Sequence, residues 1–167
     1  MTEQIAQWFA GLPKEWVVFV ISMLPIVELR GAIPWALSPA MGPPLHWAAA
    51  FGIAFCGNLV PIVPILLYLG PGSDLLRRRS PQLDRFFTWL FERTRRRGRL
   101  VERYGAIGLT LFVAIPLPVT GAWTGSAAAF VFGIPFRRAL PCVALGVVIS
   151  GTIMTLASLG IFSLIGR

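Results

Sequence analysis

Four long apolar blocks, each with few or no charged residues, constrain this chain more than any other feature. They are residues 16–37, 45–69, 104–136 and 139–166. As a helix rising about 1.5 Å per residue, each block is long enough to cross the roughly 30 Å hydrocarbon core of a bilayer. Charged residues form 13% of the chain, against about 25% in a typical soluble domain. The sequence therefore predicts an all-α, polytopic integral membrane protein, with residues 1–167 forming a single membrane domain.

The first apolar block carries two charges and three helix-perturbing residues at its centre. Glu28 and Arg30 lie among Pro25, Gly31 and Pro34. A charge at the bilayer centre costs from about 2.5 to more than 10 kcal/mol, so neither side chain is expected to face lipid. Two roles remain open for the pair: an ion pair that holds a broken backbone in place, or a proton or cation carrier beside an anion contact.

The two halves of the chain resemble each other weakly but in order. GIAFCGN at 52–58 matches GVVISGT at 146–152 with an offset of 94 residues. At an offset of 91 residues the matching pairs are Pro25 and Pro116, Gly42 and Gly133, and Pro44 and Pro135. We therefore expect two repeats, residues 16–70 and 106–166, joined by an Arg-rich segment at 73–105.

Each broken block has two possible arrangements. Residues 16–27 and 106–117 would each make only about 18 Å of helix, so neither segment spans a bilayer alone. A re-entrant hairpin followed by one transmembrane helix would make the two repeats inverted, with the Arg-rich linker in the cytoplasm. A single kinked span in each half would make the repeats parallel instead. We favour the hairpins.

A broken helix at membrane depth leaves backbone groups without helical partners, and these groups and half-helix dipoles can form a binding site. Asn58 follows a glycine in the second block, and it either bonds the hairpin backbone or lines the pathway. The candidate substrate and proton pathway consists of Glu28, Arg30, Gly31, Pro34, Asn58, Pro116, Pro118, Thr120, Gly121 and Thr124.

The linker is rich in arginine and has helical periodicity. Ser80 and Pro81 are typical of a helix start, and apolar residues then recur at helical spacing. This pattern predicts an amphipathic helix on the membrane surface that touches anionic lipid headgroups. The arginines either fix the orientation of the chain in the membrane or bind a phosphate-bearing molecule. We expect no nucleic acid partner. The lipid and topology candidates are Arg77, Arg78, Arg79, Arg95, Arg96 and Arg97.

The chain lacks the residue sets that catalysis usually needs. It has one histidine and one lysine, no paired carboxylates, no metal-ligand spacing and no phosphate-cradling loop. We therefore expect no enzyme activity, no cofactor and no bound metal.

Three motifs, ELRGAIP (28–34), GNLVPIVP (57–64) and AIPLPVTGAWTG (114–125), resemble the signature blocks of the bacterial small multi-drug export family. Val119 stands where that family's third motif usually has glycine. The family is also distantly similar to the DedA membrane proteins, which implies inverted halves with paired re-entrant hairpins and proton-linked translocation of a lipid carrier.

Together these features predict a multi-pass transporter of the bacterial inner membrane. It would export a small amphiphilic substrate by alternating access, linked to protons through Glu28, and it would form a homodimer or a larger homo-oligomer. Two alternatives stay open: a DedA-like translocase of an anionic lipid carrier such as a polyprenyl phosphate, and a non-transporting scaffold that acts through the Arg-rich helix.

Overall fold

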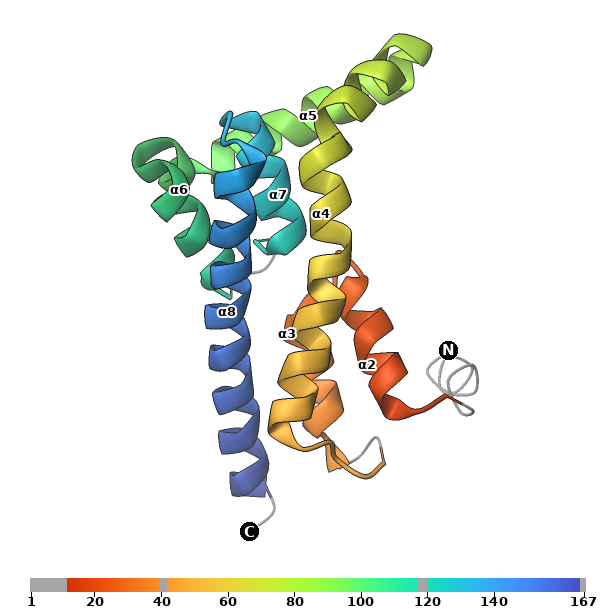
Figure 1. Cartoon of the computed structure of the whole chain (residues 1–167), viewed down its shortest axis with the longest axis vertical. Coiled ribbons are helices and arrows are strands. Elements are labelled where there is room, and N and C mark those ends of the chain that lie inside the picture. Colours follow the sequence, from red (N-terminus) through yellow and green to blue (C-terminus); the bar gives the residue numbers. More distant parts are fainter. Residues whose placement is uncertain (1–11, 40–41, 117–119, 166–167) are drawn as a thin grey trace. The chain divides into compact units, whose positions relative to one another are not determined.

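Helices are the regular elements throughout residues 12–39, 42–116 and 120–165, which the computed structural model describes (Figure 1). They are α2 (Lys14–Met23), α3 (Glu28–Leu37), α4 (Trp47–Arg79), α5 (Pro81–Arg97), α6 (Arg99–Ala114), α7 (Ala122–Val131) and α8 (Phe136–Ile165). Within these ranges, α4 and α8 are long and apolar enough to cross a membrane, each with a stretch of mean hydropathy 2.1. The all-α prediction is confirmed.

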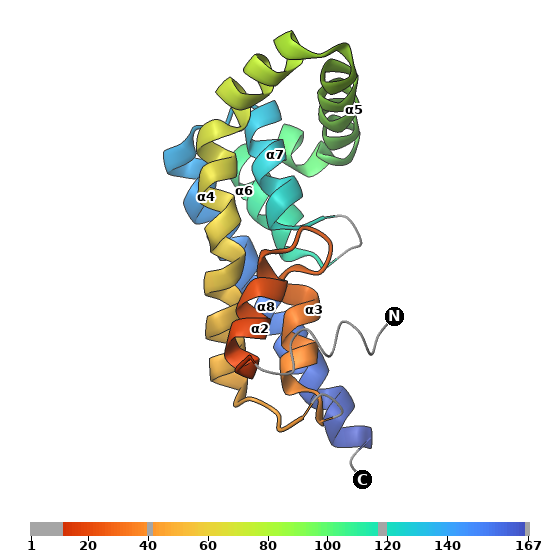
Figure 2. The same cartoon turned by 90° about the vertical axis from the view of Figure 1, so that its right-hand side faces the viewer.

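The first apolar block forms a helical hairpin of α2 and α3. Leu24 ends α2 with an extended backbone, and α3 begins at Glu28 after a four-residue turn. The open ends of the hairpin meet, because Nζ of Lys14 donates hydrogen bonds to the carbonyl oxygens of Pro43 at 3.1 Å and Ser38 at 3.5 Å. The chain thus returns to the end at which α2 began, and Figure 2 shows the two helices side by side.

The third apolar block is also divided into two packed helices, α6 and α7. Gly105 interrupts α6 with a φ of 57°, and α6 ends at Ala114. A Cβ placed on Gly125 of α7 would collide with the side chain of Val113, so the two helices approach closely there. The ring of Phe132 packs against the backbone of Gly98, which brings the end of α7 to the start of α6.

The Arg-rich segment at 73–105 is not one helix, contrary to the expected boundaries. The hydroxyl of Ser80 caps α5 by accepting the N–H of Gln82 at 3.3 Å, and Pro81 takes the first helical position, as predicted. Residues before Ser80 continue α4, and residues after Gly98 belong to α6. The amphipathic helix is therefore α5 alone, with Phe87 buried on its apolar face.

The chain divides into two compact units. The first contains α2, α3, the part of α4 up to Asn58 and the part of α8 from Gly151. The second contains residues 59–150, and so α5, α6, α7 and the remaining parts of α4 and α8. The boundary therefore falls inside both long helices, so each unit holds one broken block together with segments of α4 and α8.

In the first unit, a glycine of α4 seats the hairpin. A Cβ placed on Gly57 would collide with the carbonyl oxygen of Phe19 and lie 3.1 Å from Cβ of Ser22. The absence of a side chain at Gly57 therefore allows α2 to pack against the backbone of α4.

The second unit contains the corresponding contact, made by α8. A Cβ placed on Gly146 would lie 2.8 Å from the carbonyl oxygen of Thr110 and 2.6 Å from Cβ of Val113, both in α6. These two residues follow the α2 contact residues by 91 positions, but Gly146 follows Gly57 by 89. The glycine of α8 with a contact like that of Gly57 is thus Gly146, and not Gly151, which the sequence match pairs with Gly57.

The connections before the two long helices also share a feature. Gly42 precedes α4 with a φ of 89°, and Gly133 precedes α8 with a φ of 68°. Side chains disfavour this left-handed backbone, so both positions suit glycine. In each half, a ten-residue helix, α3 or α7, is followed by a glycine with positive φ and then by a long helix, α4 or α8.

Candidate functional site

Glu28 lies at the break between α2 and α3, at the first position of α3. Its side chain is only 6% exposed, and its φ of 50° is left-handed. A non-glycine residue in that conformation is strained by about 1–3 kcal/mol, and such strain is concentrated at functional sites. The N–H of Glu28 donates to the carbonyl oxygen of Leu24 at 2.9 Å, which closes the turn and fixes the carboxylate at the start of the helix.

Arg30 follows on the same first turn of α3 and is half-buried. The charges of Glu28 and Arg30 interact, although two residues at this spacing in a regular helix would point in different directions. Because the backbone at Glu28 is left-handed, its side chain need not point in the direction that a regular helix would give it. The two predicted charges are thus brought together at the break.

Gly31 and Pro34 do not form the break, contrary to the expectation that they help to unwind the helix. Both lie inside α3, and the turn consists of residues 24–27. Gly31 instead gives room to Val27, whose Cγ1 would collide with a Cβ at that position. Pro34 has no N–H to donate to the carbonyl oxygen of Arg30, so it removes one helical hydrogen bond in the middle of α3.

Asn58 is a buried polar residue on α4, directly after the glycine that seats α2. Its side chain is 2% exposed, and its Oδ1 has no hydrogen-bond partner among the described residues. Leaving a buried carbonyl oxygen unsatisfied costs about 1–3 kcal/mol, so such atoms are rare in folded proteins. Oδ1 of Asn58 therefore makes no bond to the hairpin backbone among the described residues, and a place in the pathway stays a prediction.

Two hydroxyl groups make local hydrogen bonds at the helix ends next to the second break. Pro116 is exposed after the end of α6, and the hydroxyl of Thr120 donates to the carbonyl oxygen of Ile115 at 3.1 Å. The N–H of Gly121 donates to Oγ1 of Thr124 at 2.8 Å, which caps α7. Both threonines therefore have local structural bonds. Pro118 lies outside the described residues.

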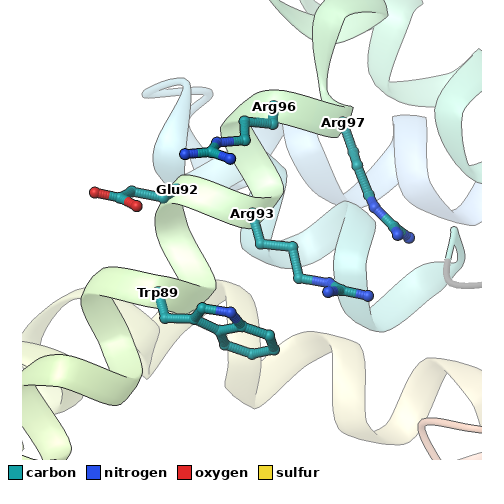
Figure 3. Close-up of a pocket in the computed structure, with 5 residues that line it drawn as sticks. All are labelled: Trp89, Glu92, Arg93, Arg96 and Arg97. Carbon is teal, nitrogen blue, oxygen red and sulfur yellow. The ribbon is translucent and has the colours of Figure 1, made fainter.

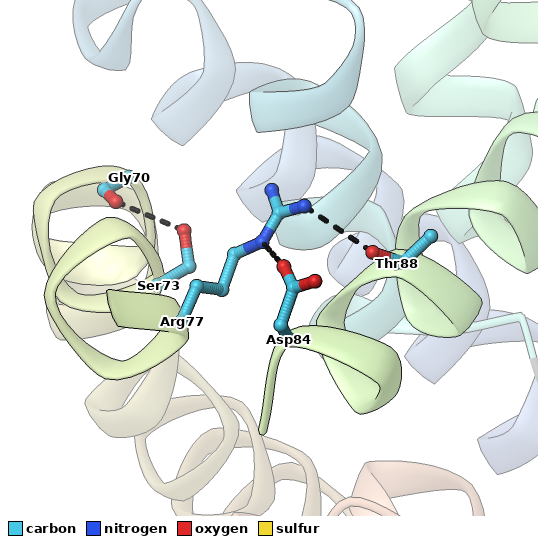
Figure 4. A network of polar contacts seen from close by, with 5 residues as sticks. All are labelled: Gly70, Ser73, Arg77, Asp84 and Thr88. Atoms are coloured by element: carbon cyan, nitrogen blue, oxygen red, sulfur yellow. Dashed lines mark hydrogen bonds and ion pairs between the residues drawn. The ribbon is translucent and has the colours of Figure 1, made fainter. Parts of the chain in front are cut away.

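The arginines of the linker have different surroundings. Arg77, near the end of α4, makes an ion pair with Asp84 of α5 at 2.6 Å and donates a hydrogen bond from Nη2 to Oγ1 of Thr88 at 3.2 Å (Figure 4). This network fixes the angle between the two helices around Ser80. Arg78, Arg79, Arg95, Arg96 and Arg97 are exposed.

A cavity of about 280 Å³ lies between α5, α6 and α7. Two predicted residues line it: Thr124, a candidate for the substrate pathway, and Arg97, a candidate for lipid contact. The other lining residues are Trp89, Leu90, Arg93, Thr94 and Phe112. Sequence reasoning did not select Trp89, Arg93 or Phe112. The four-residue spacing of Trp89 and Arg93 was an available signal, because it places both on one helix face.

The residues described here include no group of three or more His, Cys, Asp or Glu side chains that could hold a metal ion. Three of the predicted pathway residues, Glu28, Arg30 and Asn58, carry a carboxylate, a guanidinium and an amide, and none of them is exposed. The first compact unit contains all three.

Comparison with known proteins finds one family. The family model described as "Putative small multi-drug export protein" matches residues 28–153, which is more than half of the chain. The searches of curated proteins and of solved structures find no match, and the expected similarity to the DedA proteins is not shown. The matched region begins at Glu28 and includes all of α4 and the part of α8 up to residue 153. The chain belongs to the small multi-drug export protein family and is a membrane protein.

Proposed function

We propose that this protein exports small amphiphilic molecules across the bacterial inner membrane, in exchange for protons carried by Glu28. The observation that carries the proposal is the buried carboxylate of Glu28 on a left-handed backbone at the break of a helical hairpin. Ionisable residues within membrane segments are costly, and they commonly mark ion and substrate pathways. The family assignment supports export as the activity.

The hairpin of α2 and α3 is re-entrant in this proposal. Each helix has ten residues, about 15 Å, which is half of the roughly 30 Å hydrocarbon core. The contact of Lys14 with Pro43 supports entry and exit on one side of the membrane. The turn at 24–27 then lies near the bilayer midplane, where transporters with broken helices bind substrates and coupling ions.

The second hairpin of α6 and α7 is a repeat of the first, inverted in the membrane. The matching contacts of Gly57 with α2 and of Gly146 with α6 support a common ancestor for the two halves. Two inverted halves place α5 and its arginines on the cytoplasmic side, in keeping with the positive-inside rule.

Glu28 and Arg30 couple the movement of substrate to the movement of protons in this proposal. When no substrate is bound, the guanidinium of Arg30 stabilises the carboxylate of Glu28. A cationic substrate competes with Arg30 for Glu28, whereas an anionic headgroup competes with Glu28 for Arg30. Either competition changes the proton affinity of Glu28, which links substrate movement to proton movement. Asn58 supplies a buried acceptor for a substrate N–H or O–H, or for protonated Glu28.

Transport in everted membrane vesicles tests the proposal. Vesicles containing the protein would be energised with a proton gradient, and uptake of ethidium, a cationic amphiphile, and of anilinonaphthalene sulfonate, an anionic one, would be followed by fluorescence. We expect gradient-dependent uptake of at least one probe above that of vesicles without the protein, and its loss on addition of a protonophore. Uptake of neither probe would contradict export and favour the scaffold alternative.

A homodimer completes the pathway in this proposal, because seven described helices, only two of them long enough to span, enclose little space in a membrane. Chemical crosslinking in native membranes tests it, and a purely monomeric product would contradict it.

A further inference from the structure

The cavity between α5, α6 and α7 combines two unpaired cations with an apolar lining. Arg93 and Arg97 are one helical turn apart on α5, and the structure shows no ion pair or hydrogen bond for either guanidinium among the described residues. The opposite wall consists of Phe112 from α6 and Thr124 from α7, and Leu90 adds to the apolar surface. Three helices therefore build this cavity, and it is not an isolated surface feature of α5.

Aromatic contact holds one of the arginines in position. The guanidinium of Arg93 lies over the ring of Trp89, 5.2 Å from its centroid. Such a stacked guanidinium is restricted in orientation while its N–H groups remain available to an anion. Figure 3 shows that Arg93 and Arg97 extend to the same side of α5, whereas the carboxylate of Glu92 extends to the other side. Glu92 does not line the cavity, although it lines a neighbouring pocket together with Arg93 and Arg97.

We propose that this cavity binds the headgroup of one phosphate-bearing lipid. Two guanidinium groups one turn apart can both reach a single phosphate, which is the anion that their fork of donors matches best. The volume of about 280 Å³ lies just below the roughly 300–1,000 Å³ of drug-sized pockets, which suits a headgroup rather than a whole lipid. Phe112 and Leu90 provide apolar contact for the first part of the acyl chains.

The location favours a lipid over a soluble phosphate. The exposed rings of Trp89 and Phe86 on α5 are typical of side chains at a membrane interface. The exposed side chains of Ile107 and Leu111 on α6 also present apolar surface. A ligand with a charged head and an apolar tail would therefore satisfy both parts of this region.

The hydroxyl of Thr124 caps α7, so a bound headgroup contacts the residue that starts the second helix of this hairpin. The bound lipid would thus stabilise the packing of α5 on α7, which already includes the contact of Phe91 with Phe130 at 5.3 Å between ring centroids. This role is independent of the proposed transport at Glu28, and either proposal can fail without the other.

Binding of short-chain lipids to the full-length protein in detergent tests the site. The probes are dioctanoyl phosphatidic acid, dioctanoylglycerol, which lacks the phosphate, and inorganic phosphate, which lacks the chains. Isothermal titration calorimetry would measure the affinity for each. We expect binding of phosphatidic acid at least about tenfold tighter than that of either other probe. Dioctanoylglycerol loses the charge-assisted hydrogen bonds, and inorganic phosphate loses the apolar contacts of the chains.

Arginine variants separate a site from a general attraction of charge. We expect Arg93→Ala with Arg97→Ala to weaken phosphatidic acid binding at least about tenfold, and Arg85→Ala with Arg95→Ala to weaken it less than about threefold. The two control arginines are exposed on the same helix and lie outside the cavity, and their substitution removes the same amount of charge. The double variant Arg93→Lys with Arg97→Lys keeps the charge and should bind with intermediate affinity.

If the double Ala variant at positions 93 and 97 and the one at positions 85 and 95 lost the same affinity for phosphatidic acid, the proposal would be overturned, because binding would then follow net charge alone. Equal affinity for dioctanoylglycerol would overturn the phosphate contact, and equal affinity for inorganic phosphate would overturn the lipid. The thermal unfolding midpoint of each unliganded variant should equal that of the parent within about 2 °C, since none of the substituted side chains is fully buried.

Discussion

At the residue scale, the first compact unit contains two buried groups that folding alone does not explain. Glu28 combines burial with a left-handed backbone, and Asn58 keeps an oxygen without a donor among the described residues. Together these two features cost several kilocalories per mole, taken as about 1–3 kcal/mol each. Glycine at position 28 or an apolar residue at position 58 would relieve these costs, so we interpret both residues as binding residues rather than as sources of stability.

Replacing Asn58 with leucine separates these roles. We expect Asn58→Leu to leave the thermal unfolding midpoint unchanged or slightly higher, because an unsatisfied carbonyl oxygen is replaced by an apolar group of similar volume. Export should fall sharply. The measurements are thermal unfolding in detergent and probe uptake in vesicles.

Thr155→Val is the matched control for this substitution. Thr155 is equally buried, but its hydroxyl donates to the carbonyl oxygen of Gly151 at 2.8 Å. We expect this variant to lose about 0.5–1.5 kcal/mol of stability and to retain export. A lower unfolding midpoint in Asn58→Leu than in Thr155→Val would show that Asn58 holds the fold together.

At the element scale, close approaches at glycine determine how the hairpins pack. Gly57 of α4 and Gly146 of α8 each contact the backbone of the first helix of a hairpin. In a membrane, where helices gain little from the hydrophobic effect, such close packing is a main source of association. The two contacts are therefore expected to contribute similarly to the stability of the two units.

Adding one methyl group at these positions tests the packing. We expect Gly57→Ala and Gly146→Ala each to lower the free energy of unfolding by about 1–3 kcal/mol, because the new Cβ meets backbone atoms that cannot easily move. Gly52→Ala is the control, since a Cβ there has no neighbour within 4 Å among the described residues. Equal stability of the variants at 52 and 57 would contradict the proposed packing.

The sequence predicted the elements better than their boundaries. It indicated the cap at Ser80 and the division of the first and third blocks, because proline, serine and glycine act locally on the backbone. It misplaced Gly31 and Pro34, since a helix can tolerate both when its neighbours cover the altered backbone. It also missed that Phe112 and Arg93 line one cavity, because that depends on how α5, α6 and α7 pack together.

At the scale of the whole molecule, α4 sets the topology. Its 33 residues make about 50 Å of helix, which exceeds the hydrocarbon core of a bilayer. The residues near its start and the arginines near its end should therefore lie on opposite faces of the membrane. Because Lys14 contacts Ser38 and Pro43, the two ends of the first hairpin should lie on the same face as each other.

Cysteine labelling in intact cells tests this topology. In a background with Cys56→Ala and Cys142→Ser, single cysteines would replace Lys14, Ser38 or Ser80. We expect an impermeant maleimide to label positions 14 and 38 from outside, and to label position 80 only after permeabilisation. Labelling of positions 14 and 38 from opposite faces would show that the first block spans the membrane as a kinked helix.

The central claim is that Glu28 carries the protons that drive export. The most direct measurement compares the parent protein with Glu28→Gln in proteoliposomes under an imposed pH gradient, with pyranine reporting proton movement and a fluorescent amphiphile reporting transport. Glutamine keeps the size of the side chain and resembles the protonated carboxyl group, with a donor and an acceptor, but it cannot titrate. We expect the variant to retain its fold, by thermal unfolding, and to lose both gradient-driven fluxes. Full proton-driven transport by Glu28→Gln would contradict the account.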